Sequence, residues 1–162
     1  MVHAGPSQSE QRAVVPLFVI TTAQLMLVLD DSIVNIALPS IQQELGVNAV
    51  HLPWIVNAYN LTFGALLLLG GRLGDLYGRR HALQAGLALF VIASLAGGLG
   101  PNSETLIAAR AVQGLGAALV APNALALIAT TFSERKTRDA ALSLYGAMSA
   151  PELWWDCFLV AA

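Results

Sequence analysis

Long apolar runs, separated by short polar stretches, make up most of this chain. A helix that crosses a bilayer needs ~20 consecutive residues that are mostly apolar. Four runs reach about that length, at Val14 to Leu38, Leu52 to Leu69, His81 to Gly100 and Thr105 to Ala126. A fifth apolar run begins near Ala140. The pattern therefore predicts four full membrane-spanning helices and a partial fifth.

The composition agrees with a membrane protein. Hydrophobic residues make up 56% of the chain and charged residues only 11%, whereas soluble domains carry about 25% charged residues. The net charge of −2 comes without a basic stripe, which argues against nucleic acid as a partner. Cys157 is the only cysteine, and the three histidines have no metal-ligand spacing. We therefore expect no metal site and no cofactor.

The basic residues predict the orientation of the chain in the membrane. Lys and Arg in short loops favour the cytoplasmic side. Seven of the eight basic residues lie before the first run, between the second and third, or after the fourth, and the loops at 39–51 and 101–104 contain none. The amino terminus is therefore predicted to be cytoplasmic, in a multi-pass protein of the cell membrane. The first run is too long for an export signal and offers no convincing cleavage site.

The segment between the second and third runs, residues 71–80, reads G-R-L-G-D-L-Y-G-R-R. Its one acid and three arginines mark an aqueous face, and its glycines permit a sharp turn and a close approach of helix ends. We predict a tight charged hinge between two membrane helices. The segment resembles the loop between helices two and three of the major facilitator superfamily, G-x-L-a-D-r-x-G-r-k/r. Leu76 stands where that family usually has arginine.

Two further motifs surround the charged residues that lie inside apolar runs. Residues 29–39, L-D-D-S-I-V-N-I-A-L-P, resemble the signature of the fourteen-helix drug/proton antiporters of that superfamily. Residues 110–118, R-A-V-Q-G-L-G-A-A, resemble its R-x-x-Q-G-x-G-a-a motif. The three motifs occur in the family's order and cover roughly residues 14–150. The resemblance implies proton-coupled efflux of drugs or other small amphipathic molecules, by alternating access around a site near the bilayer midplane.

Asp30 and Arg110 are predicted to lie at similar depths. An Asp or Arg at the centre of a membrane helix costs about 2.5 to 3.5 kcal/mol. A helix rises 1.5 Å per residue, which places Asp30 ~12 Å and Arg110 ~8 Å below the same outer face. An ion pair between them would relieve both burial costs. The alternative is that each reaches the headgroup region independently.

Helical phase leaves open which of two neighbouring carboxylates binds the proton. Asp31 falls on one polar stripe with Thr21, Gln24 and Asn35, whereas Asp30 is rotated from it by ~100°. The family motif instead selects Asp30. Both are therefore candidates for proton coupling, together with Arg110, because a moving arginine changes the proton affinity of a buried carboxylate.

Polar side chains on the apolar helices are candidates for a substrate cavity. Asn57 and Asn60 could line such a cavity or could bond neighbouring helices, and the sequence favours neither reading. Gly86 and Gly114 are interpreted as helix-packing residues. The complete set of cavity candidates is Gln24, Asn35, Asn57, Asn60 and Gln113.

The resemblance also implies a conformational latch on the cytoplasmic side, in which Asp75 interacts with the arginines near Arg79. Because Leu76 replaces the family arginine, the latch implied here lacks that one cation. The set of latch candidates is Gly71, Asp75, Gly78, Arg79 and Arg80.

The fold class expected is an all-α membrane protein, the amino-terminal part of a major facilitator bundle. Residues 1–13 form a cytoplasmic tail, residues 14–150 the first five helices with the fifth incomplete, and residues 151–162 an atypical tail where the resemblance stops. A frame change or truncation would explain that stop, so a transport-incompetent fragment is the alternative to a transporter. The sequence shows no pairing of a nucleophile with a general base, so an enzyme is not expected. The expected partners are protons, a small-molecule substrate and the lipid bilayer, and nothing in the sequence indicates the substrate's identity or the oligomeric state.

Overall fold

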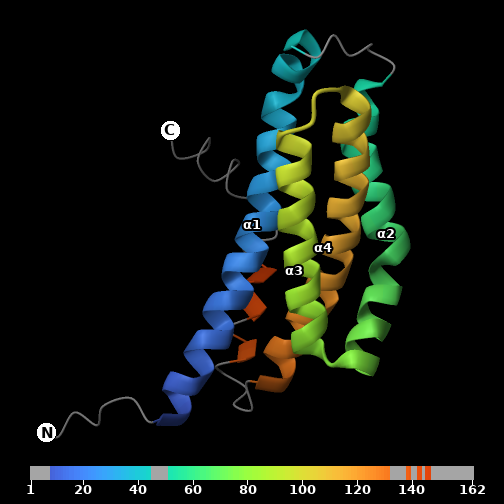
Figure 1. The fold of residues 1–162 in the computed structure, drawn as a ribbon. Coiled ribbons are helices and arrows are strands. Elements are labelled where there is room, and N and C mark those ends of the chain that lie inside the picture. Colours follow the sequence, from blue (N-terminus) through green and yellow to red (C-terminus); the bar gives the residue numbers. More distant parts are fainter. Residues whose placement is uncertain (1–7, 45–50, 132–137, 140–141, 144, 147–162) are drawn as a thin grey trace, which may run out of the picture. The chain divides into compact units, whose positions relative to one another are not determined.

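The computed structural model describes residues 8–44, 51–131, 138–139, 142–143 and 145–146. Figure 1 shows four helices among them: α1 (Gln8–Glu44), α2 (Leu52–Tyr77), α3 (Arg79–Gly98) and α4 (Ser103–Thr131). Each helix contains a stretch that is long and apolar enough to cross a membrane. The four predicted spans and the all-α class are therefore confirmed. Most of the predicted fifth span, and the tail at residues 151–162, lie outside the described residues.

The chain divides into two units. One unit consists of residues 29–124, which hold the end of α1, all of α2 and α3, and most of α4. The other consists of residues 1–28 and 125–162, and its buried side chains include Ile20, Ile128 and Tyr145. Every interhelix contact discussed below lies within residues 29–124.

Glycines bring α3 and α2 close to α4. A Cβ atom at Gly86 would lie 2.8 Å from the carbonyl oxygen of Gly116, and a Cβ at Gly114 would lie 2.5 Å from the carbonyl oxygen of Tyr59. Real Cβ atoms do not approach backbone oxygens this closely, so only glycine permits these helix separations. The packing role predicted for Gly86 and Gly114 is confirmed.

The predicted hinge at residues 71–80 is much shorter in the structure. Helix α2 does not end near Leu69 but continues to Tyr77, so that Gly71 and Gly74 are helical. The turn consists of Gly78 alone, whose φ of 93° is readily adopted only by glycine. Gly74 stays helical because its buried face packs against α4. The predicted turn was therefore right at Gly78 and wrong at Gly71 and Gly74, whereas the predicted close approach is present at Gly74.

Helix α1 is longer than predicted at both ends. It begins at Gln8 instead of Val14 and ends at Glu44 instead of Leu38, so that Pro39 is helical and the loop to α2 is shorter than predicted. A proline removes one helical hydrogen bond, but it does not have to end a helix. Pro39 is exposed, so its surroundings leave room for the ring. The apolar pattern located the span and not the helix ends.

Candidate functional site

Arg110 is the largest fully buried side chain among the described residues, with 1% of its surface exposed. It lies in the second turn of α4, where the small residues Ala109 and Gly114 are also buried and leave space for a long side chain. A buried guanidinium needs a counter-charge and hydrogen-bond acceptors to offset the loss of water. The surrounding helices supply both.

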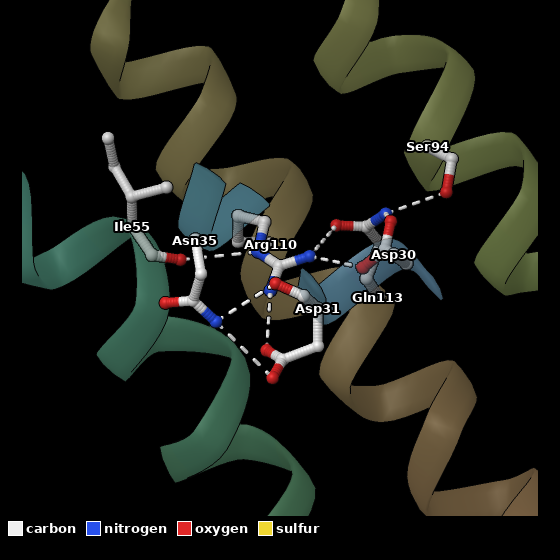
Figure 2. Close-up of polar contacts among 7 residues, drawn as sticks. All are labelled: Asp30, Asp31, Asn35, Ile55, Ser94, Arg110 and Gln113. Atoms are coloured by element: carbon white, nitrogen blue, oxygen red, sulfur yellow. Dashed lines mark hydrogen bonds and ion pairs between the residues drawn. The ribbon is translucent and has the colours of Figure 1, made fainter. Parts of the chain in front are cut away.

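Figure 2 shows the groups that surround the Arg110 guanidinium. Its Nε donates a hydrogen bond to the main-chain carbonyl oxygen of Ile55 on α2, at 3.2 Å. Its Nη1 donates to Oδ2 of Asp30 on α1, forming an ion pair. Nη1 also donates to Oε1 of Gln113, at 3.1 Å. The Asp30–Arg110 pair that the depth argument predicted is therefore present.

Gln113 extends this group of contacts to α3. Its Nε2 donates to Oδ1 of Asp30 at 3.0 Å and to Oγ of Ser94 at 2.6 Å. The carbonyl and the amino group of this amide are therefore both engaged. Side chains or main-chain groups of all four helices meet here. We call this group the Arg110 cluster; its members are Asp30, Asp31, Ile55, Tyr59, Ser94, Arg110 and Gln113.

Asp31 belongs to the same cluster but is held differently. Its Oδ1 lies 3.7 Å from Nη2 of Arg110, which is within ion-pair range and too long for a hydrogen bond. Its side chain is 47% exposed, compared with 18% for Asp30. The Asn35 amide donates to the Asp31 carbonyl oxygen at 2.9 Å and lies 3.5 Å from its Oδ2. Helical phase placed Asp31 beside Asn35 correctly, and the depth argument paired Asp30 with Arg110.

Tyr59 covers one face of the guanidinium. The Arg110 Cζ atom lies 4.6 Å from the centre of the Tyr59 ring, and Phe63 stacks on that ring with a centroid separation of 6.1 Å. A cation over an aromatic face is attracted by the ring quadrupole. The sequence analysis missed Tyr59 and Ser94. The signal for Tyr59 is its position one turn after Ile55 on α2, whereas a lone serine in an apolar helix carries no such signal.

The other predicted cavity residues do not join the cluster. Asn57 and Asn60 are exposed on α2. Gln24 is buried, but it belongs to the unit that holds residues 1–28. Asn35 contacts the cluster through Asp31. Of the five cavity candidates, Gln113 is the one that bonds Arg110 directly. A cavity lined by these residues therefore stays a prediction.

The latch candidates lie around the turn between α2 and α3. Asp75 accepts a hydrogen bond from Arg79 at 3.2 Å, across the turn at Gly78. The two side chains are 56% and 35% exposed, so solvent screens the pair and its effect on stability is small. Arg80 is exposed and Gly71 is partly buried inside α2. Within the described part of the chain, no three His, Cys, Asp or Glu side chains gather as they would around a metal ion.

The cluster places two carboxylates around one buried guanidinium, so its formal charge is −1 when both carboxylates are ionised. A proton on Asp30 would bring that charge to zero and replace the ion pair with a neutral acid beside a cation.

Comparisons with known proteins agree with these features. A family model described as Major Facilitator Superfamily matches residues 20–150. The puromycin resistance protein pur8 of Streptomyces alboniger is 52% identical over 133 residues, which cover 82% of this chain and 26% of that protein. The cephamycin export protein CmcT of Amycolatopsis lactamdurans is 42% identical over 145 residues, 90% of this chain and 30% of that protein. The methylenomycin A resistance protein of Streptomyces coelicolor is 42% identical over 136 residues, 84% of this chain and 29% of that protein. The chain thus spans less than a third of the length of these relatives.

Proposed function

Because the chain belongs to the Major Facilitator Superfamily, we propose that it forms the amino-terminal part of a membrane transporter that exports small amphipathic molecules, drugs among them, in exchange for protons. The observation that carries the proposal is the Arg110 cluster, in which an ion pair between a buried guanidinium and the partly buried Asp30 joins the membrane-spanning helices α1 and α4. The names of the relatives, which refer to antibiotic resistance and export, support drugs as the substrate class.

Asp30 is the residue proposed to take the proton. When Asp30 is ionised, Arg110 is held by it and by Gln113. When Asp30 is protonated, it no longer offers a negative charge, and the buried guanidinium has Asp31 as its remaining counter-ion, 3.7 Å away. A small movement of Arg110 toward Asp31 keeps the cation paired inside the membrane. This movement is the proposed link between proton binding and a change in helix packing.

The substrate is proposed to enter beside Asp31, the more exposed of the two carboxylates. Asn35 on α1 and Asn57 and Asn60 on α2 are exposed polar groups on apolar helices, and exposed amides can hydrogen-bond a ligand. Gln113 completes the proposed cavity set within residues 29–124, and Gln24 belongs to the other unit. A proton and a cationic substrate would then compete for the single excess negative charge of the cluster.

The latch role proposed for the α2–α3 turn rests on the resemblance and on the geometry of the pair. Gly78 supplies the positive φ, and the Asp75–Arg79 ion pair spans the turn. Arg80 follows and presents a further exposed cation. We propose that this turn faces the cytoplasm and that the amino terminus lies on the same side of the cell membrane.

Labelling of single cysteines placed at His51 or Tyr77, with Cys157 replaced by Ser, tests this orientation in intact cells. Reaction with an impermeant thiol reagent at position 51 and not at 77 is expected, and the reverse pattern would contradict it.

A segment exchange tests the export function directly. The segment of the puromycin resistance protein pur8 that matches this chain is replaced by the corresponding residues of this chain, and the hybrid is expressed in a puromycin-sensitive host. We expect the hybrid to confer resistance, and dissipation of the proton gradient to restore puromycin accumulation in the cells. The same hybrid carrying Asp30→Asn should reach the membrane in equal amount and confer no resistance. A hybrid that accumulates in the membrane without resistance would instead support the alternative, a transport-incompetent fragment.

A further inference from the structure

Asn123 is a buried amide on α4 that the Arg110 cluster does not use. It is 2% exposed, and its Nδ2 donates two hydrogen bonds. One goes to the carbonyl oxygen of Leu119 on the same helix, at 2.8 Å. The other goes to the carbonyl oxygen of Gly70 on α2, at 3.0 Å. In a membrane interior, where water is absent, such an interhelix bond from an amide contributes to helix association.

Glycine at position 74 makes room for this amide. A Cβ atom at Gly74 would overlap Oδ1 of Asn123, so that any larger residue would push the amide away from Gly70. Gly71, the residue after Gly70, has space: a Cβ there would lie 3.6 Å from the Cβ of Pro122 on α4, an ordinary contact distance. The close approach of α2 to α4 therefore depends on Gly74 and Asn123 together.

Pro122 explains a second contact at the same level. A proline in a helix has no N–H to donate to the carbonyl four residues earlier, which here is that of Ala118. That carbonyl oxygen lies against Gly70, where a Cβ atom would overlap it. The carbonyls of Gly70 and Ala118 thus lie at the α2–α4 contact, and Asn123 bonds the first of them.

We propose that Asn123 is a positioning residue that clamps the last turns of α2 to α4. Arg110 bonds Ile55 near the start of both helices, and Asn123 bonds Gly70 further along both, so the two helices run parallel and are joined at two levels. The clamp makes α2 and α4 one rigid pair. It therefore carries movement of Arg110 to the Asp75 end of α2 instead of letting the helices slide past each other. The clamp itself does not depend on the transport function proposed above.

The first test measures coupling between Gly74 and Asn123 in the full chain, purified in detergent micelles, by thermal unfolding followed by circular dichroism. Asn123→Ala is expected to lower Tm by about 2 to 4 °C, chiefly through loss of the interhelix hydrogen bond to Gly70, since the bond to Leu119 lies within α4. Gly74→Ala is expected to lower Tm at least as much, because it displaces the amide. The double variant should be no worse than Asn123→Ala alone, because the alanine at 123 removes the overlap.

Three glycine variants serve as matched controls. Gly64→Ala, which meets no atom within 4 Å, and Gly71→Ala should not lower Tm, because alanine favours a helix more than glycine does. Gly70→Ala should be destabilising with or without Asn123→Ala, because it meets the main-chain oxygen of Ala118. Additive effects of Gly74→Ala and Asn123→Ala would overturn the clamp. If Gly74→Ala alone does not accumulate, we expect the double variant Gly74→Ala, Asn123→Ala to accumulate again. If the double variant also fails to accumulate while Asn123→Ala alone folds, the clamp is contradicted.

The second test reads the position of α2 relative to α4. Gly71→Cys and Pro122→Cys are introduced with Cys157→Ser, because a Cβ–Cβ distance near 3.6 Å fits a disulfide. We expect a mild oxidant to form this disulfide quickly in membranes. Asn123→Ser, whose hydroxyl can still bond Leu119 but is too short to reach Gly70, should slow its formation several-fold. An unchanged rate would show that Asn123 does not set the position of α2, whatever its effect on Tm.

Discussion

Asp31 lies 3.7 Å from the guanidinium of Arg110 and is more than twice as exposed as Asp30, which bonds the same guanidinium directly. The two neighbouring carboxylates are therefore not equivalent. Asp30 shares the buried side of the cluster with Gln113, whereas Asp31 forms its accessible edge. This difference leads to separate expectations for their substitution.

Asp30→Asn should abolish proton-driven efflux in the pur8 hybrid, whereas Asp31→Asn should weaken it and leave proton dependence in place. An asparagine at position 30 still accepts a hydrogen bond but cannot bind and release a proton. Asp31 contributes only a long contact to Arg110, so its loss leaves the buried pair intact. Resistance and proton-driven substrate uptake into inverted vesicles measure both effects. Equal loss in the two variants would contradict the division of roles.

Replacing Arg110 alone should destabilise the chain more than replacing Arg110 and Asp30 together. Arg110→Met leaves the partly buried Asp30 without its counter-charge, which is expected to reduce the free energy of unfolding by ~3 kcal/mol, the lower end of the range for a buried pair. Asp30→Asn combined with Arg110→Met should recover part of that loss, because no lone charge remains. Arg110→Lys should recover only part of it, since an ammonium restores the counter-charge of Asp30 but cannot bond Ile55, Asp30 and Gln113 at once in the fork geometry of a guanidinium. Chemical denaturation of the chain in micelles measures all three, and a double variant less stable than Arg110→Met would count against the pair.

The sequence predicted the cluster's charged members because burial of charge in a membrane helix is costly enough to demand a partner. It could not predict how one guanidinium would serve two adjacent carboxylates. Helical phase separates Asp30 and Asp31 by ~100°, but an arginine side chain is long and forked, so that its two terminal nitrogens reach both. Ser94 and the carbonyl of Ile55 were beyond the sequence as well, because their role depends on helix rotation and separation and not on residue type.

Helix ends were the least predictable part of the fold. The glycines and charges of residues 71–80 are compatible with a turn and equally with a closely packed helix, since glycine occurs in both. Only the contact of Gly74 with Asn123, 49 positions later in the chain, shows why α2 continues to Tyr77. Periodicity along one segment carries no information about such a partner.

Substitutions of Tyr59, whose ring lies over Arg110, can separate the cation–π contribution to stability from the packing contribution. Tyr59→Phe keeps the ring face and should change the free energy of unfolding little. Tyr59→Leu removes the ring and should reduce it by ~0.5 to 2 kcal/mol from the lost cation–π contact, in addition to any packing loss. Comparing the two substitutions in the wild type and in Arg110→Met isolates the cationic part. If the difference between Phe and Leu is the same in both backgrounds, the ring is acting through packing alone.

Gln113→Glu should make the stability of the chain depend on pH with a defined sign. Nε2 of Gln113 lies 3.0 Å from Oδ1 of Asp30, so a glutamate here would place two carboxylate oxygens at hydrogen-bond distance. With Asp31, three carboxylates would then surround the single Arg110 guanidinium and could not all ionise without strong repulsion, so the folded variant should hold one proton among them that the unfolded chain releases at neutral pH. Because the folded state then binds more protons than the unfolded state, its free energy of unfolding should fall as pH rises, relative to wild type. Denaturation of Gln113→Glu and of the uncharged control Gln113→Leu at several pH values measures this slope. A slope in the control equal to that of the glutamate variant, or an opposite slope in the glutamate variant, would show that residue 113 does not face Asp30 in the folded protein.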